Sequence, residues 1–92
     1  MQKKEFRDYM LIVEKLSIHG TESRITRAHK GADLLGYSFD HAVSSDDLMY
    51  DSLMRLKPLE DPRHTPIQNA LRKYYQFKHR KSFPQLRHYK RC

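Results

Sequence analysis

The stretch from Thr65 to Lys81 constrains the fold of this chain more than any other part of its sequence. Its apolar residues recur at steps of three and four, which places them on one stripe of an α-helix. They are Ile67, Ala70, Leu71, Tyr74 and Phe77 or Lys78. Thr65 can cap this helix, and Pro66 suits its first position because the missing N–H is not needed there. The sequence therefore predicts a helix that buries one face against other elements.

Three more helices are predicted before this stretch. They span Gln2 to Leu16, Thr21 to about Leu35, and Ser44 or Ser45 to about Leu56, with a single turn at Ser38 between the last two. The inner face of the first would carry Phe6, Tyr9, Met10, Val13 and Leu16. Small residues on the second helix would let another helix approach it closely; they are Ala28, Gly31 and Ala32. Gly36 suits the left-handed position that ends the second helix. Because no convincing strand pair accompanies these patterns, we expect an all-α fold, a small bundle of four to five helices.

A chain of 92 residues has room for one small domain. We expect a single helical domain over residues 1–92, with the bundle in residues 1–81. Residues 82–92 would form a basic C-terminal extension or a short helix, because Ser82 and Gln85 have the spacing of a capping box. A disordered basic tail is the alternative interpretation of this segment.

Positive charge is concentrated at one end of the sequence. Up to Asp61 there are nine Lys and Arg against eleven Asp and Glu, whereas from Pro62 onward there are nine Lys and Arg and no acidic residue. Such a segment attracts polyanions and speeds encounter with them. A solubilising tail is the alternative, but the charge favours binding to nucleic acid through counterion release.

Candidate binding residues follow from this charge distribution. The predicted second helix carries a cation every three residues, at Arg24, Arg27 and Lys30. These residues form either a cationic strip that binds phosphates or an ordinary solvated face. Most of the other candidates either lie away from the apolar stripe of the helix that starts at Thr65 or follow that helix in the chain. They are Arg72, Lys73, Lys78, Arg80, Lys81, Arg87, Lys90 and Arg91. Tyr75 would point outward beside Arg72, where it could stack on an unpaired base or rest on the protein surface.

The sequence lacks the residues that several classes of function require. Six scattered histidines and a single cysteine, Cys92, offer no metal-site spacing, so no metal and no cofactor are expected. The sequence holds no G-x-S-x-G motif and no glycine-rich phosphate loop, which argues against an enzyme. The N-terminus lacks a long apolar region, and one cysteine fits a reducing compartment. We therefore expect no membrane partner and a cytoplasmic location.

Four segments together resemble a known family of DNA-binding modules. They are EFRDYM, TESRITRAHKGADLLG, SSDDLM and QNALRKYYQFK, within residues 4–81. This pattern resembles the helical, SAM-like core-binding domain at the N-terminus of tyrosine recombinases, whose members clamp DNA with helix faces. The resemblance implies that Arg24, Arg27, Arg72 and Lys73 face the DNA backbone. Because no catalytic domain follows here, the resemblance implies a stand-alone binder.

In size and charge the chain is also similar to phage anti-CRISPR proteins. Two hypotheses follow. The first is a non-enzymatic, phage- or mobile-element-encoded protein that binds DNA or RNA through its cationic C-terminal face. The second is an inhibitor that binds protein subunits and guide RNA of a host ribonucleoprotein, a type I surveillance complex, and blocks its binding of target DNA.

Overall fold

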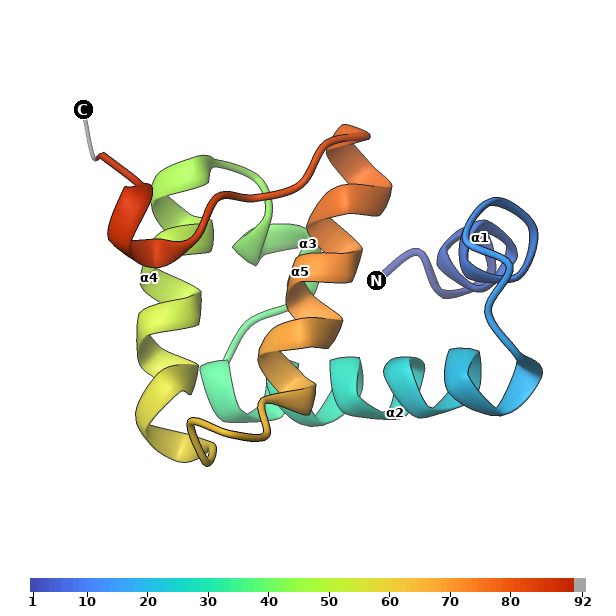
Figure 1. Cartoon of the computed structure of the whole chain (residues 1–92), viewed down its shortest axis with the longest axis horizontal. Helices are drawn as coiled ribbons and strands as arrows, with labels where there is room; N and C mark the ends of the chain where they lie inside the picture. Colours follow the sequence, from blue (N-terminus) through green and yellow to red (C-terminus); the bar gives the residue numbers. More distant parts are fainter. Residues whose placement is uncertain (91–92) are drawn as a thin grey trace.

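Helices make up the secondary structure of residues 1–90, which are the residues that the computed structural model describes. Figure 1 shows their arrangement. In chain order they are α1 (Lys3–Asp8), a π-helical segment (Tyr9–Val13), α2 (Ile18–Leu35), α3 (Phe39–Ala42), α4 (Asp46–Leu56), a 3₁₀ turn (Lys57–Leu59), α5 (Pro66–His79) and a second 3₁₀ turn (Leu86–His88). No β-strand occurs among these residues. The predicted all-α bundle of four to five helices is confirmed.

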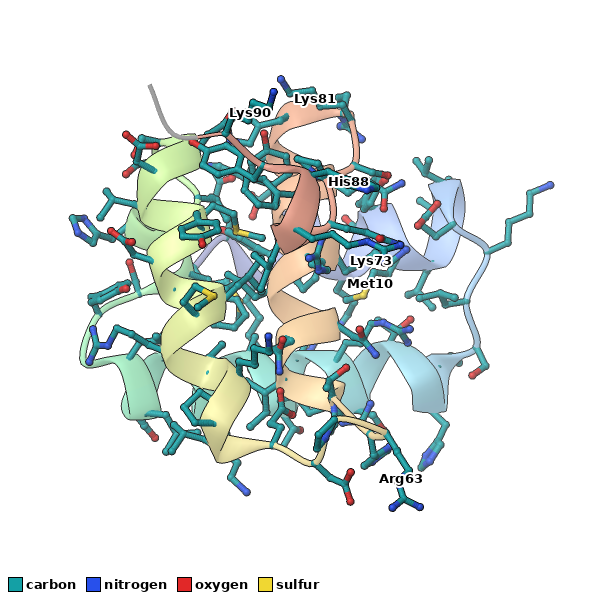
Figure 2. All side chains as sticks on the ribbon, turned by 60° about the vertical axis from the view of Figure 1, so that its left-hand side comes forward. Met10, Arg63, Lys73, Lys81, His88 and Lys90 are labelled. Atoms are coloured by element: carbon teal, nitrogen blue, oxygen red, sulfur yellow. The ribbon has the colours of Figure 1, made fainter. Side chains whose placement is uncertain are left out.

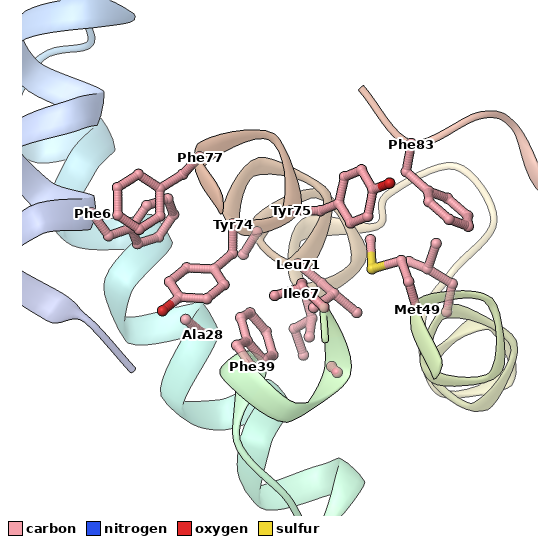
Figure 3. Close-up of a cluster of buried hydrophobic side chains, with 14 of the residues drawn as sticks. Phe6, Ala28, Phe39, Met49, Ile67, Leu71, Tyr74, Tyr75, Phe77 and Phe83 are labelled. Carbon is pink, nitrogen blue, oxygen red and sulfur yellow. The ribbon is translucent and has the colours of Figure 1, made fainter. Parts of the chain in front are cut away.

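The helix α5 crosses α2 and is the centre of the bundle (Figure 1). The predicted stripe is buried: Ile67, Ala70, Leu71, Tyr74 and Phe77 are all at most 8% exposed. Lys78, the alternative to Phe77 on that stripe, is exposed. Figure 3 shows this stripe against Phe6 of α1, Phe39 of α3 and Met49 of α4. Because every other α-helix contributes to this one core, α5 fixes the relative positions of the helices.

Close packing between α2 and the elements around it depends on Gly31. A Cβ atom built at Gly31 would lie 2.8 Å from the Phe39 ring and 2.9 Å from Cγ2 of Ile67. Such distances leave no room for a side chain. The sequence-based prediction that small residues let another helix approach here is confirmed at this position.

The first helix departs from its prediction after Asp8. The chain continues as a π-helix over Tyr9–Val13 rather than as an α-helix to Leu16. The wider turn changes which side chains face inward, since each residue advances less around the axis. Phe6, Tyr9 and Met10 are buried as expected, but Val13 is 58% exposed. The placement of Val13 on the inner face is therefore wrong.

Capping explains where the other helices begin. Oγ of Ser17, Ser38 and Ser45 accepts a backbone N–H from the first turn of α2, α3 and α4 respectively. The helix α2 therefore starts before Thr21, which is buried within it. At its other end Gly36 adopts the left-handed conformation, with φ of 83°, as its position predicts.

The start of α5 is capped from a distance. Thr65 makes no side-chain capping bond, contrary to its predicted role. Instead, the Glu60 carboxylate accepts the N–H groups of Ile67 at 2.7 Å and Gln68 at 3.0 Å. A carboxylate there also faces the positive end of the helix dipole. The loop before α5 thus holds the helix that forms the core.

The segment after α5 packs on the bundle as far as residue 90. Phe83 is 5% exposed and its ring contacts Tyr75 and Tyr89, while Tyr89 also stacks on Tyr50 of α4. Within residues 1–90 Ser82 makes no capping hydrogen bond. Gln85 precedes a 3₁₀ turn, Leu86–His88, which takes the place of the predicted short helix. Figure 1 shows this segment crossing from α5 to α4.

Candidate nucleic-acid interface

A pocket between α2, α5 and the segment that follows α5 gathers three of the predicted binding residues. Its volume is about 260 Å³. It is lined by Arg24 from α2, by Asn69, Arg72, Lys73 and Gln76 from α5, and by Ser82 and Phe83. We call this hollow the α2–α5 pocket. Of the seven lining residues within 1–90, six carry side-chain N–H or O–H donors and none carries a carboxylate, so this lining suits an anion.

Arg24 is the least engaged cation of the α2–α5 pocket. Its Nε–H is buried and has no hydrogen-bond acceptor among residues 1–90. Buried polar groups are nearly always paired, and one without a partner calls for an explanation. The fold thus leaves a guanidinium at this pocket with donor capacity that it does not use.

Arg72 binds the chain that follows its own helix. One guanidinium nitrogen, Nη1, donates to the carbonyl oxygens of Phe83 at 2.9 Å and Pro84 at 3.1 Å. The guanidinium also lies over the Phe83 ring, 5.8 Å from its centroid. Burial lowers the pKa of Arg72, although an arginine remains cationic at neutral pH. Arg72 therefore holds the wall of the α2–α5 pocket in place and adds charge to it.

Lys73 is paired with the carboxylate of Glu14, just before α2. Both side chains are about a fifth exposed, at 21% and 22%. The pair ties α5 to the end of the π-helical segment. The positive charge of Lys73 is therefore partly neutralised, and Lys73 contributes less to the electrostatic field of the pocket than Arg24 does.

The remaining cations do not join this group. Arg27 lines a separate hollow along α2 with His19, Glu22, Ser23 and Thr26, so the predicted strip of Arg24, Arg27 and Lys30 is divided. Lys30, Lys81, Arg87 and Lys90 are exposed. In Figure 2, Lys81 and Lys90 lie at the end of the molecule opposite Arg63. Arg91 lies outside the described residues.

Lys78 and Arg80 face the first helical segment instead. Lys78 Nζ donates to the side-chain oxygen of Gln2 at 2.8 Å and lies 3.7 Å from Asp40. Arg80 ends α5 in the left-handed conformation, and its guanidinium lies over the Tyr9 ring at 4.9 Å from the centroid. These two residues hold α5 against the N-terminal segment and lie outside the α2–α5 pocket.

Tyr75 does not point outward, and its prediction as a stacking residue is wrong. It is 1% exposed, and its ring lies against His79 and Phe83. Its hydroxyl donates to Asp46 Oδ1 at 2.7 Å. Burial, followed by this bond, raises the pKa of Tyr75. The apolar stripe of α5 is wider than its spacing indicates, because the segment from Ser82 covers a second side of the helix.

The residues that sequence reasoning missed share a polar stripe on α5. Asn69 and Gln76 recur with Arg72 and Lys73 at steps of three and four, which puts all four on one face. That spacing was visible in the sequence. What it could not indicate was that Arg24 and Ser82, distant in the chain, close the same pocket.

Two observations bear on other kinds of site. Residues 1–90 contain no cluster of three or more His, Cys, Asp or Glu side chains that could hold a metal ion. No helix within that range has the length and apolar character needed to cross a membrane.

Comparisons with protein-family models, with curated proteins and with solved structures give no match to this chain. The resemblance to the core-binding domain of tyrosine recombinases therefore stays a hypothesis.

Proposed function

We propose that this protein binds duplex nucleic acid through contacts to the phosphate backbone, centred on the α2–α5 pocket. The observation that carries the proposal is the convergence of Arg24, Arg72 and Lys73 on one hollow whose lining has no carboxylate. Cations in such a place release the counterions condensed on a polyanion, and this contribution does not depend on base sequence. Exposed Lys30 and Lys81 add to the same long-range attraction.

The placement of the aromatic rings favours duplex over single strands. Every phenylalanine and tyrosine in residues 1–90 is buried or half-buried. Proteins that bind single strands stack successive bases on exposed aromatic rings, which contributes about 1–3 kcal/mol per base. Because the described surface has no such platform, backbone charge is the main source of affinity that it offers. A duplex supplies that charge at higher density than a single strand.

Fluorescence anisotropy with a random-sequence duplex and a single strand of equal length tests the proposal. If three cations contact phosphates, the logarithm of the duplex binding constant should fall against the logarithm of salt concentration with a slope of about −3. The duplex should bind more tightly than the single strand at every salt concentration.

Two results would contradict the proposal. Tighter binding of the single strand would show that bases, not the backbone, are recognised. Absence of salt-dependent binding to any free nucleic acid would favour the second hypothesis, a protein that acts on a host nucleoprotein complex.

A further inference from the structure

We propose that the α2–α5 pocket is a binding site for a phosphomonoester, the terminal phosphate of a nucleic-acid strand. This inference rests on the proposed function for the identity of the strand. It goes further because it assigns the pocket to a terminal phosphate group and not to the phosphodiesters along the backbone.

The net charge of the pocket favours a phosphomonoester. Arg24, Arg72 and Lys73 line the pocket, and among residues 1–90 the Glu14 carboxylate pairs with Lys73. Three cations and one anion leave a formal charge of +2. A phosphomonoester carries about −1.5 to −2 at neutral pH, whereas each phosphodiester carries a single negative charge. The pocket therefore matches the charge of the monoester better.

The hydrogen-bond donors of the pocket come from separate segments of the chain. Arg24 comes from α2, Asn69 and Gln76 come from α5, and Ser82 comes from the segment beyond it. A monoester offers three strong acceptor oxygens pointing in different directions, and a phosphodiester leaves only two free. Donors that approach from three segments of the chain suit the group with three oxygens.

The guanidinium of Arg24 has a donor that the fold leaves unused. Arg24 Nε–H is buried with no acceptor among residues 1–90. Arginine binds phosphate oxygens through paired N–H groups in a planar fork. An anion bound at the pocket, which Arg24 lines, would draw on donors of this guanidinium that the fold does not engage.

Size and surroundings favour a strand end over a free nucleotide. The α2–α5 pocket, of about 260 Å³, has room for a phosphate group among donors from three segments of the chain. Phe83, the one aromatic residue of the lining, is 5% exposed and cannot stack on a base. The rest of a bound nucleic acid would lie over the outer surface, where Lys81, next to Ser82 in the chain, is exposed.

Competition binding with the full chain tests the inference. Two duplexes of identical sequence are compared, one with 5′-hydroxyl ends and one with 5′-phosphate ends. We expect the phosphorylated duplex to bind about tenfold more tightly, the effect of one added charge-assisted contact. In Arg24→Gln both duplexes should bind more weakly and this ratio should fall to about one, because the fork is lost. The matched control Arg63→Gln removes an exposed loop arginine outside the pocket and should keep the ratio.

A second variant and a small probe keep the result interpretable. Ser82→Ala removes one donor without changing charge and should lower the ratio about threefold. Inorganic phosphate, added at constant ionic strength, should shift the side-chain amide NMR signals of Asn69 and Gln76 in a saturable way. Circular dichroism of each variant checks that it is folded.

The outcomes separate the two proposals. Equal affinity of wild-type protein for both duplexes would overturn the terminal-phosphate site and leave backbone binding intact. Saturable binding of inorganic phosphate without binding of either duplex would overturn the nucleic-acid function and the strand-end ligand together. A phosphoserine peptide that binds as tightly as the phosphorylated duplex would overturn the assignment to nucleic acid.

Discussion

Two tyrosine hydroxyls of α5 are bound by carboxylates from the neighbouring short helices. Tyr74 donates to Asp40 at α3, and Tyr75 donates to Asp46 at the start of α4. Both rings are buried in the core, while each hydroxyl is hydrogen-bonded to a carboxylate. These bonds fix α3 and the start of α4 against α5 more specifically than apolar packing alone.

Tyr75→Phe tests this role. The variant loses the bond to Asp46 but keeps the ring, and Asp46 is exposed, so water can replace the lost donor. We expect the free energy of unfolding to fall by about 1–2 kcal/mol, measured by chemical denaturation. Duplex affinity should stay unchanged. A large loss of affinity with no loss of stability would mean that Tyr75 binds a base after all.

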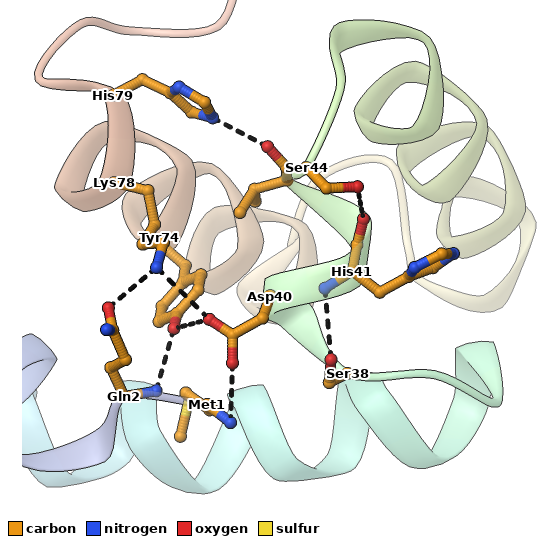
Figure 4. A network of polar contacts seen from close by, with 10 residues as sticks. Met1, Gln2, Ser38, Asp40, His41, Ser44, Tyr74, Lys78 and His79 are labelled. Carbon is orange, nitrogen blue, oxygen red and sulfur yellow. Dashed lines mark hydrogen bonds and ion pairs between the residues drawn. The ribbon is translucent and has the colours of Figure 1, made fainter.

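Asp40 is the centre of a polar network that Figure 4 shows. Its carboxylate pairs with the amino group of Met1 at 2.9 Å and accepts from Tyr74, whose hydroxyl also accepts the N–H of Gln2 at 3.0 Å. Burial opposes ionisation of Asp40, but the Tyr74 bond and the Met1 ammonium outweigh it, so the pKa of Asp40 is lowered.

The lowered pKa of Asp40 predicts how stability depends on pH. A carboxyl with a depressed folded pKa stabilises the protein above its unfolded pKa, and that stabilisation is lost as pH falls through the folded value. Asp40→Asn should therefore be less stable than wild type at neutral pH. The difference should shrink below the ordinary carboxyl pKa of 3.8. Urea denaturation across this range measures it, and a difference independent of pH would contradict the prediction.

At the scale of elements, α5 depends on a cap that lies outside it. The Glu60 carboxylate accepts two N–H groups of its first turn, whereas Thr65, the residue next to the helix, makes no side-chain capping bond. A cap supplied from a preceding loop fixes the loop and the helix together. The orientation of α5 against α2 therefore depends on residues of the loop as well as on the core.

A pair of alanine variants separates the two capping residues. Glu60→Ala leaves two amides without their acceptor and should lower the free energy of unfolding by about 0.5–2 kcal/mol. Thr65→Ala removes a hydroxyl that makes no capping bond and should change it by less than about 0.5 kcal/mol. Thermal melting of both variants measures the difference. A larger loss of stability in Thr65→Ala than in Glu60→Ala would mean that Thr65 caps the helix.

Prediction from sequence succeeded where spacing and local chemistry decide the structure. The buried stripe of α5, the single turn at Ser38 and the left-handed Gly36 all depend on residues close in the chain. It failed where a distant element intervenes. The segment beyond Ser82 buries Tyr75, and a π-helical turn exposes Val13, and neither follows from helical periodicity.

The same distinction applies to the candidate site. Charge and spacing identified Arg24, Arg72 and Lys73, but they could not indicate that Lys78 and Arg80 face the other side of α5. Because Arg72, Lys73 and Arg80 each make contacts within the fold, reversing their charges would also destabilise the protein. Arg24, whose Nε–H has no acceptor among the described residues, is the better probe of binding.

Across the whole molecule, Arg24 is the cation of the α2–α5 pocket that the fold engages least, whereas Arg72 and Lys73 also hold the fold together. The acid-free α2–α5 pocket lies in a domain whose other polar contacts largely hold helices together. Charge at the pocket should thus affect binding, and charge elsewhere on the surface should affect it little beyond the general field.

The most direct test is the salt dependence of duplex binding by wild-type protein, Arg24→Gln and Arg63→Gln. Each variant removes one arginine charge, the first at the α2–α5 pocket and the second on an exposed loop. We predict that Arg24→Gln weakens binding and makes the salt slope shallower by about 0.9, while Arg63→Gln leaves the slope unchanged. Equal slopes for both variants and wild type would contradict the central claim that this pocket contacts the phosphate backbone.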